Sequence, residues 1–143
     1  MNYPKIANLS MEYFGSCLCG GIEFKVTGDF ESFYLCHCAY CRKDTGSAHA
    51  ANLFSKTAKL EWSKSETEIK IFQLPQSQHM KAFCSNCGSA MPYLQQQEKL
   101  LVVPAGSLDT ILEKRPNAHI FVSKKAVWDE LLEEIHTFQW LPD

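Results

Sequence analysis

No stretch of this 143-residue sequence approaches the roughly 18 consecutive apolar residues that a membrane-spanning helix needs. The first six residues (MNYPKI) also lack the apolar run of a secretory signal peptide. We therefore expect a soluble, cytoplasmic protein that does not associate with a membrane.

An excess of positive charge is also missing. The chain carries 14 lysines and arginines against 16 aspartates and glutamates, which gives a formal net charge of −2 at pH 7. Without a long-range positive field, a protein has little attraction for phosphate backbones. A nucleic-acid partner is therefore not expected.

The sequence further lacks a glycine- and serine-rich linker, a low-complexity run and a repeat with a period of about 20 to 50 residues. Its length fits one domain of about 100 to 200 residues, and its 45% hydrophobic content is enough for a packed core. We expect a single domain over residues 15–143. Residues 1–14 show no clear pattern and are expected to form a peripheral arm.

Short alternating or apolar runs predict that most of the chain is β-rich. The expected strands lie around residues 22–26, 69–71, 99–103 and 119–122. Helical periodicity is confined to Val127, Leu131 and Ile135, which recur every four residues and predict a helix over 126–135. A turn of helix is also expected after Ser107. The prediction is a mainly β fold with one or two short helices.

What the sequence does have is seven cysteines, an odd number at short spacings. This pattern favours metal-bound thiolates in a reducing compartment over disulfides. All seven lie in three groups: Cys17-Leu18-Cys19, Cys36-His37-Cys38-Ala39-Tyr40-Cys41 and Cys84-Ser85-Asn86-Cys87.

The first and last groups together supply four zinc ligands. Zinc prefers tetrahedral coordination by deprotonated sulfur, and cysteines two or three residues apart can present both sulfurs to one ion. Cys84 and Cys87 form such a pair, and Cys17 and Cys19 would face the same way on an extended chain. The two pairs therefore predict one closed, structural zinc site.

The middle group then has three cysteines, Cys36, Cys38 and Cys41, and no fourth cysteine to join them. Catalytic zinc sites usually keep one coordination position open for water or substrate, whereas structural sites fill all four. We therefore predict two zinc ions per chain, the second of them catalytic.

Two other interpretations of the cysteines stay open. The three-cysteine group could be closed by His37, His49 or a more distant histidine, although His37 lies between two ligands and would normally point away from their metal. We interpret His37 as a core residue or as a group that supports the ligands. Alternatively, the closely spaced cysteines could exchange disulfides, but no thioredoxin-like βαβ context is visible.

Three cysteine motifs, in this order, resemble the glutathione-dependent formaldehyde-activating family, also called the centromere-protein-V family. They are residues 15–21 (GSCLCGG), 36–47 (CHCAYCRKDTGS) and 83–88 (FCSNCG), followed by 106–109 (GSLD), 118–122 (AHIFV) and Trp128. The resemblance covers about residues 15 to 140. It implies a β-tent fold, in which small antiparallel sheets are clamped by a structural zinc, and it implies the same division of the cysteines.

The resemblance also implies an activity, the condensation of glutathione with formaldehyde, which is a carbon–sulfur lyase or synthase reaction. A small thiol such as glutathione and an aldehyde are thus the expected partners. Arg42 and Lys43 are candidates for binding substrate carboxylates, with a solvated basic pair as the alternative. Residues 45–47 could donate hydrogen bonds to the zinc-bound sulfurs or simply form a turn.

A second function of a different class is a non-catalytic interaction module, in which both zinc ions only staple a small β-domain. The discriminating feature is whether the second metal has a fourth position that a thiol can reach or a fourth protein ligand.

Overall fold

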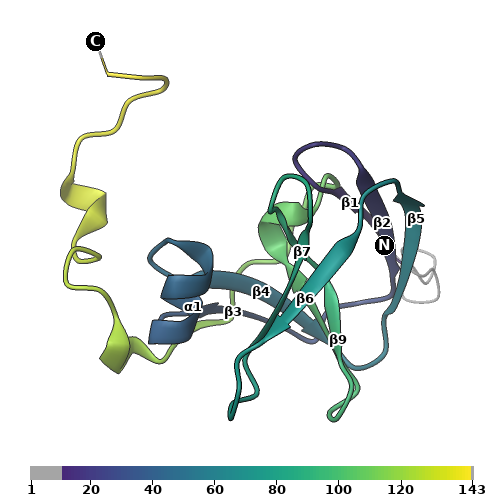
Figure 1. Cartoon of the computed structure of the whole chain (residues 1–143). Helices are drawn as coiled ribbons and strands as arrows, with labels where there is room; N and C mark the ends of the chain where they lie inside the picture. Colours follow the sequence, from purple (N-terminus) through teal and green to yellow (C-terminus); the bar gives the residue numbers. More distant parts are fainter. Residues whose placement is uncertain (1–10, 143) are drawn as a thin grey trace, which may run out of the picture.

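The computed structural model describes residues 11–142, which form three small β-sheets and one short α-helix (Figure 1). The first sheet is antiparallel, in the order β1-β2-β5, and consists of β1 (Glu12–Ser16), β2 (Ile22–Thr27) and β5 (Lys59–Ser65). Ile22, Phe24 and Val26 of β2 are almost fully buried, as their alternation predicted. One face of this sheet therefore packs into the core.

The second sheet has five strands in the order β11-β3-β4-β10-β9. Their bounds are β3 (Ser32–Cys36), β4 (Ala50–Ser55), β9 (Tyr93–Gln95), β10 (Leu100–Pro104) and β11 (Ala118–Ile120). Strand β11 runs parallel to β3, whereas the other pairs of this sheet are antiparallel. This parallel pairing ties the late part of the chain to the strand that carries Cys36.

The third sheet is antiparallel, in the order β6-β7-β8, with β6 (Ile69–Gln73), β7 (Met80–Cys84) and β8 (Ala90–Met91). The expected strands around 22–26, 69–71, 99–103 and 119–122 thus correspond to β2, β6, β10 and β11. The last is shorter than expected, because Phe121 adopts a left-handed conformation (φ 56°) that ends the strand.

The helix α1 (Ala39–Thr45) was not expected at this place. It has no buried residue, so no hydrophobic periodicity marks it in the sequence. Single 3₁₀ turns form η2 (Ala105–Ser107), η3 (Val122–Lys124) and η4 (Leu132–Glu134). Among the described residues, no helix is long and apolar enough to cross a membrane.

The prediction of a helix over residues 126–135 is wrong. That segment forms a hydrogen-bonded turn at residues 126–129 and the 3₁₀ turn η4, and Val127, Leu131 and Ile135 are 92%, 59% and 61% exposed. A helix of this length is marginal on its own and needs an apolar face packed on the rest of the protein. Val127, Leu131 and Ile135 do not pack on the rest of the protein, so nothing stabilises a helix here.

The first sheet begins before residue 15, inside the stretch 1–14 for which the sequence predicts a peripheral arm. Residues 12–14 belong to β1, pair with β2 and place Tyr13 in the core at 7% exposure. Residues 1–10 lie outside the described part of the chain. The first sheet therefore starts inside the segment that had been assigned to the arm.

All three sheets contribute to one hydrophobic core. Its largest buried side chains are Phe24, Phe30, Ile22, Leu53, Met91, Val26 and Val103. Burial of one such side chain contributes about 1.5–3 kcal/mol. Cys17 and Cys84 are themselves buried and belong to this core.

Gly15 shows how closely the first sheet packs. A Cβ at this position would lie 2.6 Å from the Ser107 carbonyl oxygen and would overlap the buried ring of Phe24. We predict that Gly15→Ala lowers the free energy of unfolding by about 1–3 kcal/mol. Thermal unfolding of Gly106→Ala is the control, because a Cβ on Gly106 meets nothing within 4 Å. Equal stability of the two variants would contradict this packing.

Candidate metal centres

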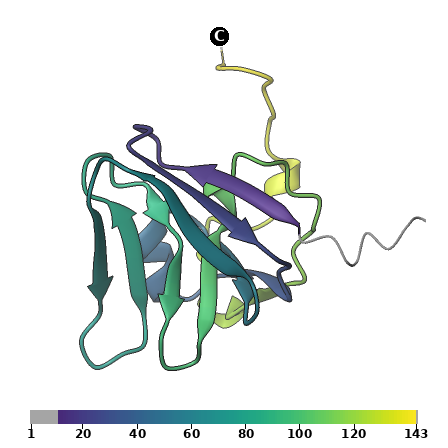
Figure 2. The ribbon, with the colours of Figure 1, turned by 90° about the vertical axis from the view of Figure 1, so that its right-hand side faces the viewer.

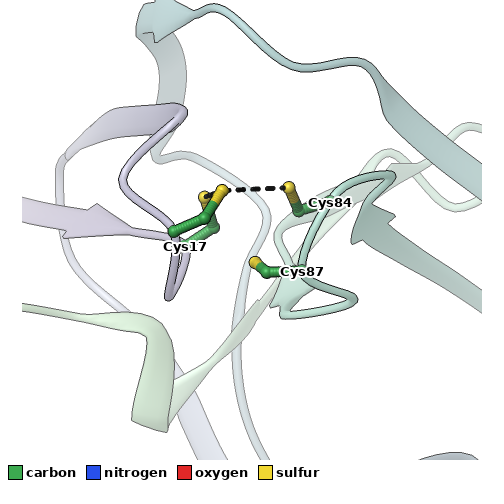
Figure 3. A group of neighbouring side chains, drawn as sticks. Cys17, Cys84 and Cys87 are labelled. Atoms are coloured by element: carbon green, nitrogen blue, oxygen red, sulfur yellow. Dashed lines mark hydrogen bonds between the residues drawn. The ribbon is translucent and has the colours of Figure 1, made fainter.

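The four-cysteine cluster joins two loops. Cys17 and Cys19 lie in the turn between β1 and β2, whereas Cys84 ends β7 and Cys87 lies in the turn before β8. Figure 3 shows the side chains of Cys17, Cys84 and Cys87 converging from these loops. The cluster therefore links the first sheet to the third.

The spacing of the four sulfur atoms fits a tetrahedral zinc ion. All four lie within 4.8 Å of one another; Cys19 Sγ is 3.5 Å from Cys17 Sγ and 3.8 Å from Cys84 Sγ. Four sulfurs at about 2.3 Å from one zinc would be about 3.8 Å apart. Two sulfurs at 3.5 Å are also too far apart for a disulfide bond, which has a length of about 2.05 Å.

Neighbouring polar groups favour the thiolate forms that a metal requires. The hydrogen bond between Cys87 Sγ and the Ser89 hydroxyl, together with one to the Ser89 backbone, lowers the pKa of Cys87 to about 5, and the Thr67 hydroxyl, 3.1 Å from Cys84 Sγ, lowers the pKa of Cys84. Burial raises the pKa of Cys17. The sequence interpretation missed Thr67 and Ser89, although a serine two residues after a ligand is a visible signal.

The three-cysteine cluster is built around the start of α1. Cys36 ends β3, Cys38 is the N-cap of the helix, and Cys41 lies in its first turn. The Cys41 amide donates to Cys38 Sγ over 3.3 Å. The three sulfur atoms lie within 4.8 Å of one another, so they too can share one metal ion.

The thiols of this cluster differ in acidity. Burial raises the pKa of Cys36 and that of Cys41, and hydrogen bonds with the neighbouring thiols raise the pKa of Cys41 further. Burial also acts to raise the pKa of Cys38, but hydrogen bonds from the Cys41 and Tyr40 amides and from the other two thiols outweigh it and lower the pKa. Metal binding at this cluster would therefore release protons.

Among residues 11–142, no further cysteine, histidine, aspartate or glutamate lies close enough to the three sulfurs to act as a fourth ligand. His37 is 1% exposed, and its Nε2 lies 2.8 Å from Nδ1 of His119. The His49 ring packs against His37, with ring centroids 5.1 Å apart. Neither histidine completes the site, so the cluster supplies three ligands.

A cavity of about 310 Å³ adjoins the three-cysteine cluster, and Cys36 and Cys41 form part of its wall. Its apolar lining includes Phe54 and Met91. Cys17 borders a different depression of about 610 Å³, but its own cluster already has four cysteines. A small molecule in the cavity would thus meet the cluster that has only three ligands.

The polar side of this cavity is a hydrogen-bonded group at the end of α1 and the start of β7. Asp44 Oδ2 is 2.7 Å from His79 Nε2, and Asp44 Oδ1 is 3.1 Å from Lys81 Nζ. Lys81 Nζ also donates to the Asp44 carbonyl oxygen over 2.8 Å. Asp44 therefore fixes both an imidazole and an ammonium group at the cavity wall.

Tyr93 lines the same cavity. Burial, followed by the nearby charges of Asp44 and Cys41, raises its pKa to about 12. The hydroxyl therefore stays protonated near neutral pH and can donate a hydrogen bond to a bound molecule.

The two basic residues proposed to bind substrate are not in the wall of this cavity. Arg42 and Lys43 border a smaller depression of about 180 Å³ beside Trp128. The next residues complete the helix: the Thr45 hydroxyl donates to the Cys41 carbonyl, and Gly46 caps the C-terminus with φ 64° and donates to the Arg42 carbonyl. These donors satisfy backbone oxygens rather than cysteine sulfurs.

His79 and Lys81 were not identified from the sequence as site residues. Their signal is weak: they lie two apart, immediately before and within the strand that ends at Cys84, so they share one side of it. Only the fold brings them to Asp44, which lies 35 residues before His79 in the chain.

Comparison with known proteins bears on the fold and on the family of this chain. A solved structure of a protein from Rhodobacter sphaeroides, determined as a structural genomics target, has a similar fold, with a TM-score of 0.54 and 18% sequence identity over 74% of this chain and 98% of that one. No match was found among curated proteins. The glutathione-dependent formaldehyde-activating enzyme family matches residues 12–124, more than half of the chain. The protein therefore belongs to the glutathione-dependent formaldehyde-activating enzyme family.

Proposed function

We propose that the protein is a zinc-dependent carbon–sulfur lyase or synthase that acts on adducts of a small thiol, such as glutathione, with formaldehyde or a related aldehyde. The observation that carries this proposal is the cavity of about 310 Å³ beside a three-cysteine cluster that has no fourth ligand among the described residues. A purely structural site would have its coordination filled by the protein.

Each cluster would have a separate task. Cys17, Cys19, Cys84 and Cys87 would hold a structural zinc between two sheets, and Cys36, Cys38 and Cys41 would hold the catalytic ion. Zinc at the second cluster would supply an open position at which a substrate thiol loses its proton and becomes a nucleophile at neutral pH.

The reaction itself forms one carbon–sulfur bond. The substrate sulfur attacks the carbonyl carbon, the electron pair of the carbonyl π bond moves to oxygen, and this oxygen takes up a proton. Thiol plus aldehyde thus gives a hemithioacetal, and the reverse step returns both. The protein must therefore move a proton to and from the aldehyde oxygen.

His79 is the best candidate for this proton transfer. It lines the cavity with Cys36 and Cys41, and Asp44 holds its Nε2 at 2.7 Å, which leaves Nδ1 to exchange a proton. The protonated Tyr93 can donate a second hydrogen bond to the same oxygen. Lys81 adds a cation at this wall for an anionic substrate group.

The proposed activity is tested by the rate of exchange between adduct and free reactants, because thiols add to formaldehyde without a catalyst. Exchange spectroscopy by NMR on glutathione and labelled formaldehyde at equilibrium measures both directions. The zinc-loaded protein is expected to raise the exchange rate in proportion to its concentration. An exchange rate equal to that of protein-free buffer, with glutathione and with smaller thiols, would contradict the proposal.

The role of His79 predicts a catalytic loss without loss of metal. His79→Gln is expected to lower the exchange rate about 10²-fold while both clusters keep their zinc. Asp44→Asn should have a smaller effect, and the double variant should resemble His79→Gln, since the two residues act as a unit. Exchange rates and zinc content of the three variants test this. Additive losses would show that His79 and Asp44 act independently.

A further inference from the structure

The end of the chain forms an exposed segment, residues 130–142, which we term the tail. The last buried side chain before it is Asp129, at 8% exposure, and every residue from 130 to 142 is exposed. Figures 1 and 2 show this segment, in yellow, standing away from the three sheets in two perpendicular views. The tail thus makes no packed contact with its own domain.

The tail is nevertheless rich in large apolar side chains. The exposed ones are Leu131 (59%), Leu132 (40%), Ile135 (61%), Phe138 (58%), Trp140 (84%) and Leu141 (87%). So many adjacent exposed apolar groups are unusual on a soluble monomer and mark a surface that another protein covers. The tail also contains Glu130, Glu133 and Glu134 but no lysine or arginine, so it is acidic as well as apolar.

The residues that lead into the tail, 118–129, which we term its root, are held by the domain, in contrast to the tail itself. Strand β11 pairs with β3, Ala126 and Asp129 are buried, and Lys125 Nζ lies 3.5 Å from the Glu130 carboxylate. Beyond this point the backbone hydrogen bonds are local ones within the turn η4. The fixed root therefore directs the tail away from its own domain.

The domain also carries a cleft of matching character. A depression of about 390 Å³ beside α1 and β6 is lined by the large side chains of Tyr40, Phe72 and Leu74 and by the polar residues Lys43, Asp44, His79 and Lys81. Tyr40 and Phe72 are 53% and 52% exposed. Among the described residues, Lys43 makes no ion pair. Apolar walls beside an unpaired cation complement an acidic, apolar peptide.

We propose that the tail of one molecule binds in this cleft of a second copy of the same chain, and that the exchange is reciprocal. Fully extended, residues 130–142 reach at most about 45 Å, which exceeds the diameter of a domain of this size. A reciprocal exchange closes a two-fold dimer, because each copy provides one tail and one cleft. No free tail or cleft then remains.

Binding of the partner's tail would also add to the wall of the proposed catalytic cavity. The cleft and the cavity share three residues, Asp44, His79 and Lys81. A partner tail in the cleft would therefore lie against the group that fixes the proposed proton donor. This consequence depends on the proposed function, whereas the dimer itself does not.

The oligomeric state of the zinc-loaded full chain tests the exchange. Light scattering coupled to size exclusion, across a concentration series, is expected to give twice the 16.3 kDa of one chain. Trp140→Ser combined with Leu141→Ser should weaken the dimer at least about tenfold. Ile111→Ser is the matched control, because Ile111 is 84% exposed on the domain, outside the tail, and its loss should leave the dimer intact.

Reversal of charges on the cleft and on the tail tests where the tail binds. Lys43→Glu alone, and Glu133→Lys with Glu134→Lys alone, should each weaken the dimer, whereas the combined variant should recover much of the affinity. A monomeric full chain, assemblies that grow beyond a dimer, a dimer insensitive to the tail variant, or no recovery in the combined variant would each overturn the proposal. These outcomes are independent of the thiol exchange assay.

Discussion

Replacing Cys84 with serine is expected to unfold the protein. Cys84 is 1% exposed, ends β7 and lies in one cluster with Cys17 and Cys19, so a zinc ion bound there would clamp the third sheet to the loop that follows β1. A structural zinc contributes about 10–16 kcal/mol of binding free energy, which equals or exceeds the total stability of about 5–15 kcal/mol of a typical domain. Loss of one ligand would remove most of that contribution.

Circular dichroism and zinc analysis of Cys84→Ser would show this as loss of the cooperative thermal transition and of both metal ions. The control is a substitution of the same chemistry at the other cluster, Cys38→Ser. Chelation of the wild type should reproduce the behaviour of Cys84→Ser. A folded Cys84→Ser protein with an unchanged melting temperature would refute the structural role of this cluster.

Cys38→Ser is expected to preserve the fold and abolish activity. Cys38 caps α1 because its sulfur accepts a hydrogen bond from the Cys41 amide. Serine is a favourable N-cap, so the helix should still begin at the same residue. The remaining thiolates of Cys36 and Cys41 cannot hold zinc tightly. Loss of a group that merely supports a ligand lowers metal affinity or activity about 10- to 100-fold. Loss of a ligand itself should therefore lower the exchange rate more than about 100-fold.

Elemental analysis should find one zinc per chain in Cys38→Ser, with thermal unfolding close to that of the wild type. The exchange rate of glutathione and formaldehyde then reports the activity of the same sample. Two retained zinc ions together with full activity would show that Cys38 is not a ligand. Simultaneous loss of both metals and of the fold would favour two structural sites.

Both cysteine clusters could be predicted from the sequence, because metal ligation restricts the spacing of ligands along the chain. Pairs such as Cys84 and Cys87 carry their geometry locally, and the remaining three cysteines follow by subtraction. The strand β2 was equally visible, because burial of alternate residues leaves the period-two pattern of Ile22, Phe24 and Val26.

The other parts of the fold depend on long-range contacts that no local pattern records. The helix α1 buries none of its residues and is set by its cap and by the cysteines. In the segment 126–135 the periodic residues Val127, Leu131 and Ile135 stay exposed, and the backbone forms turns instead of an α-helix. Likewise, Asp44 and His79 meet only because β7 lies beside α1 in the folded chain. Their position facing the cavity could not be read from the residues around them.

The most direct test of an open thiol site is X-ray absorption at the zinc edge, combined with elemental analysis, before and after addition of glutathione. Four and three cysteine ligands predict two zinc ions with an average of 3.5 sulfur neighbours each, from seven sulfurs shared by two ions. Saturating glutathione should raise this average to four, because its sulfur fills the open position at the second ion. An unchanged average, or a single zinc per chain in the folded protein, would contradict the account.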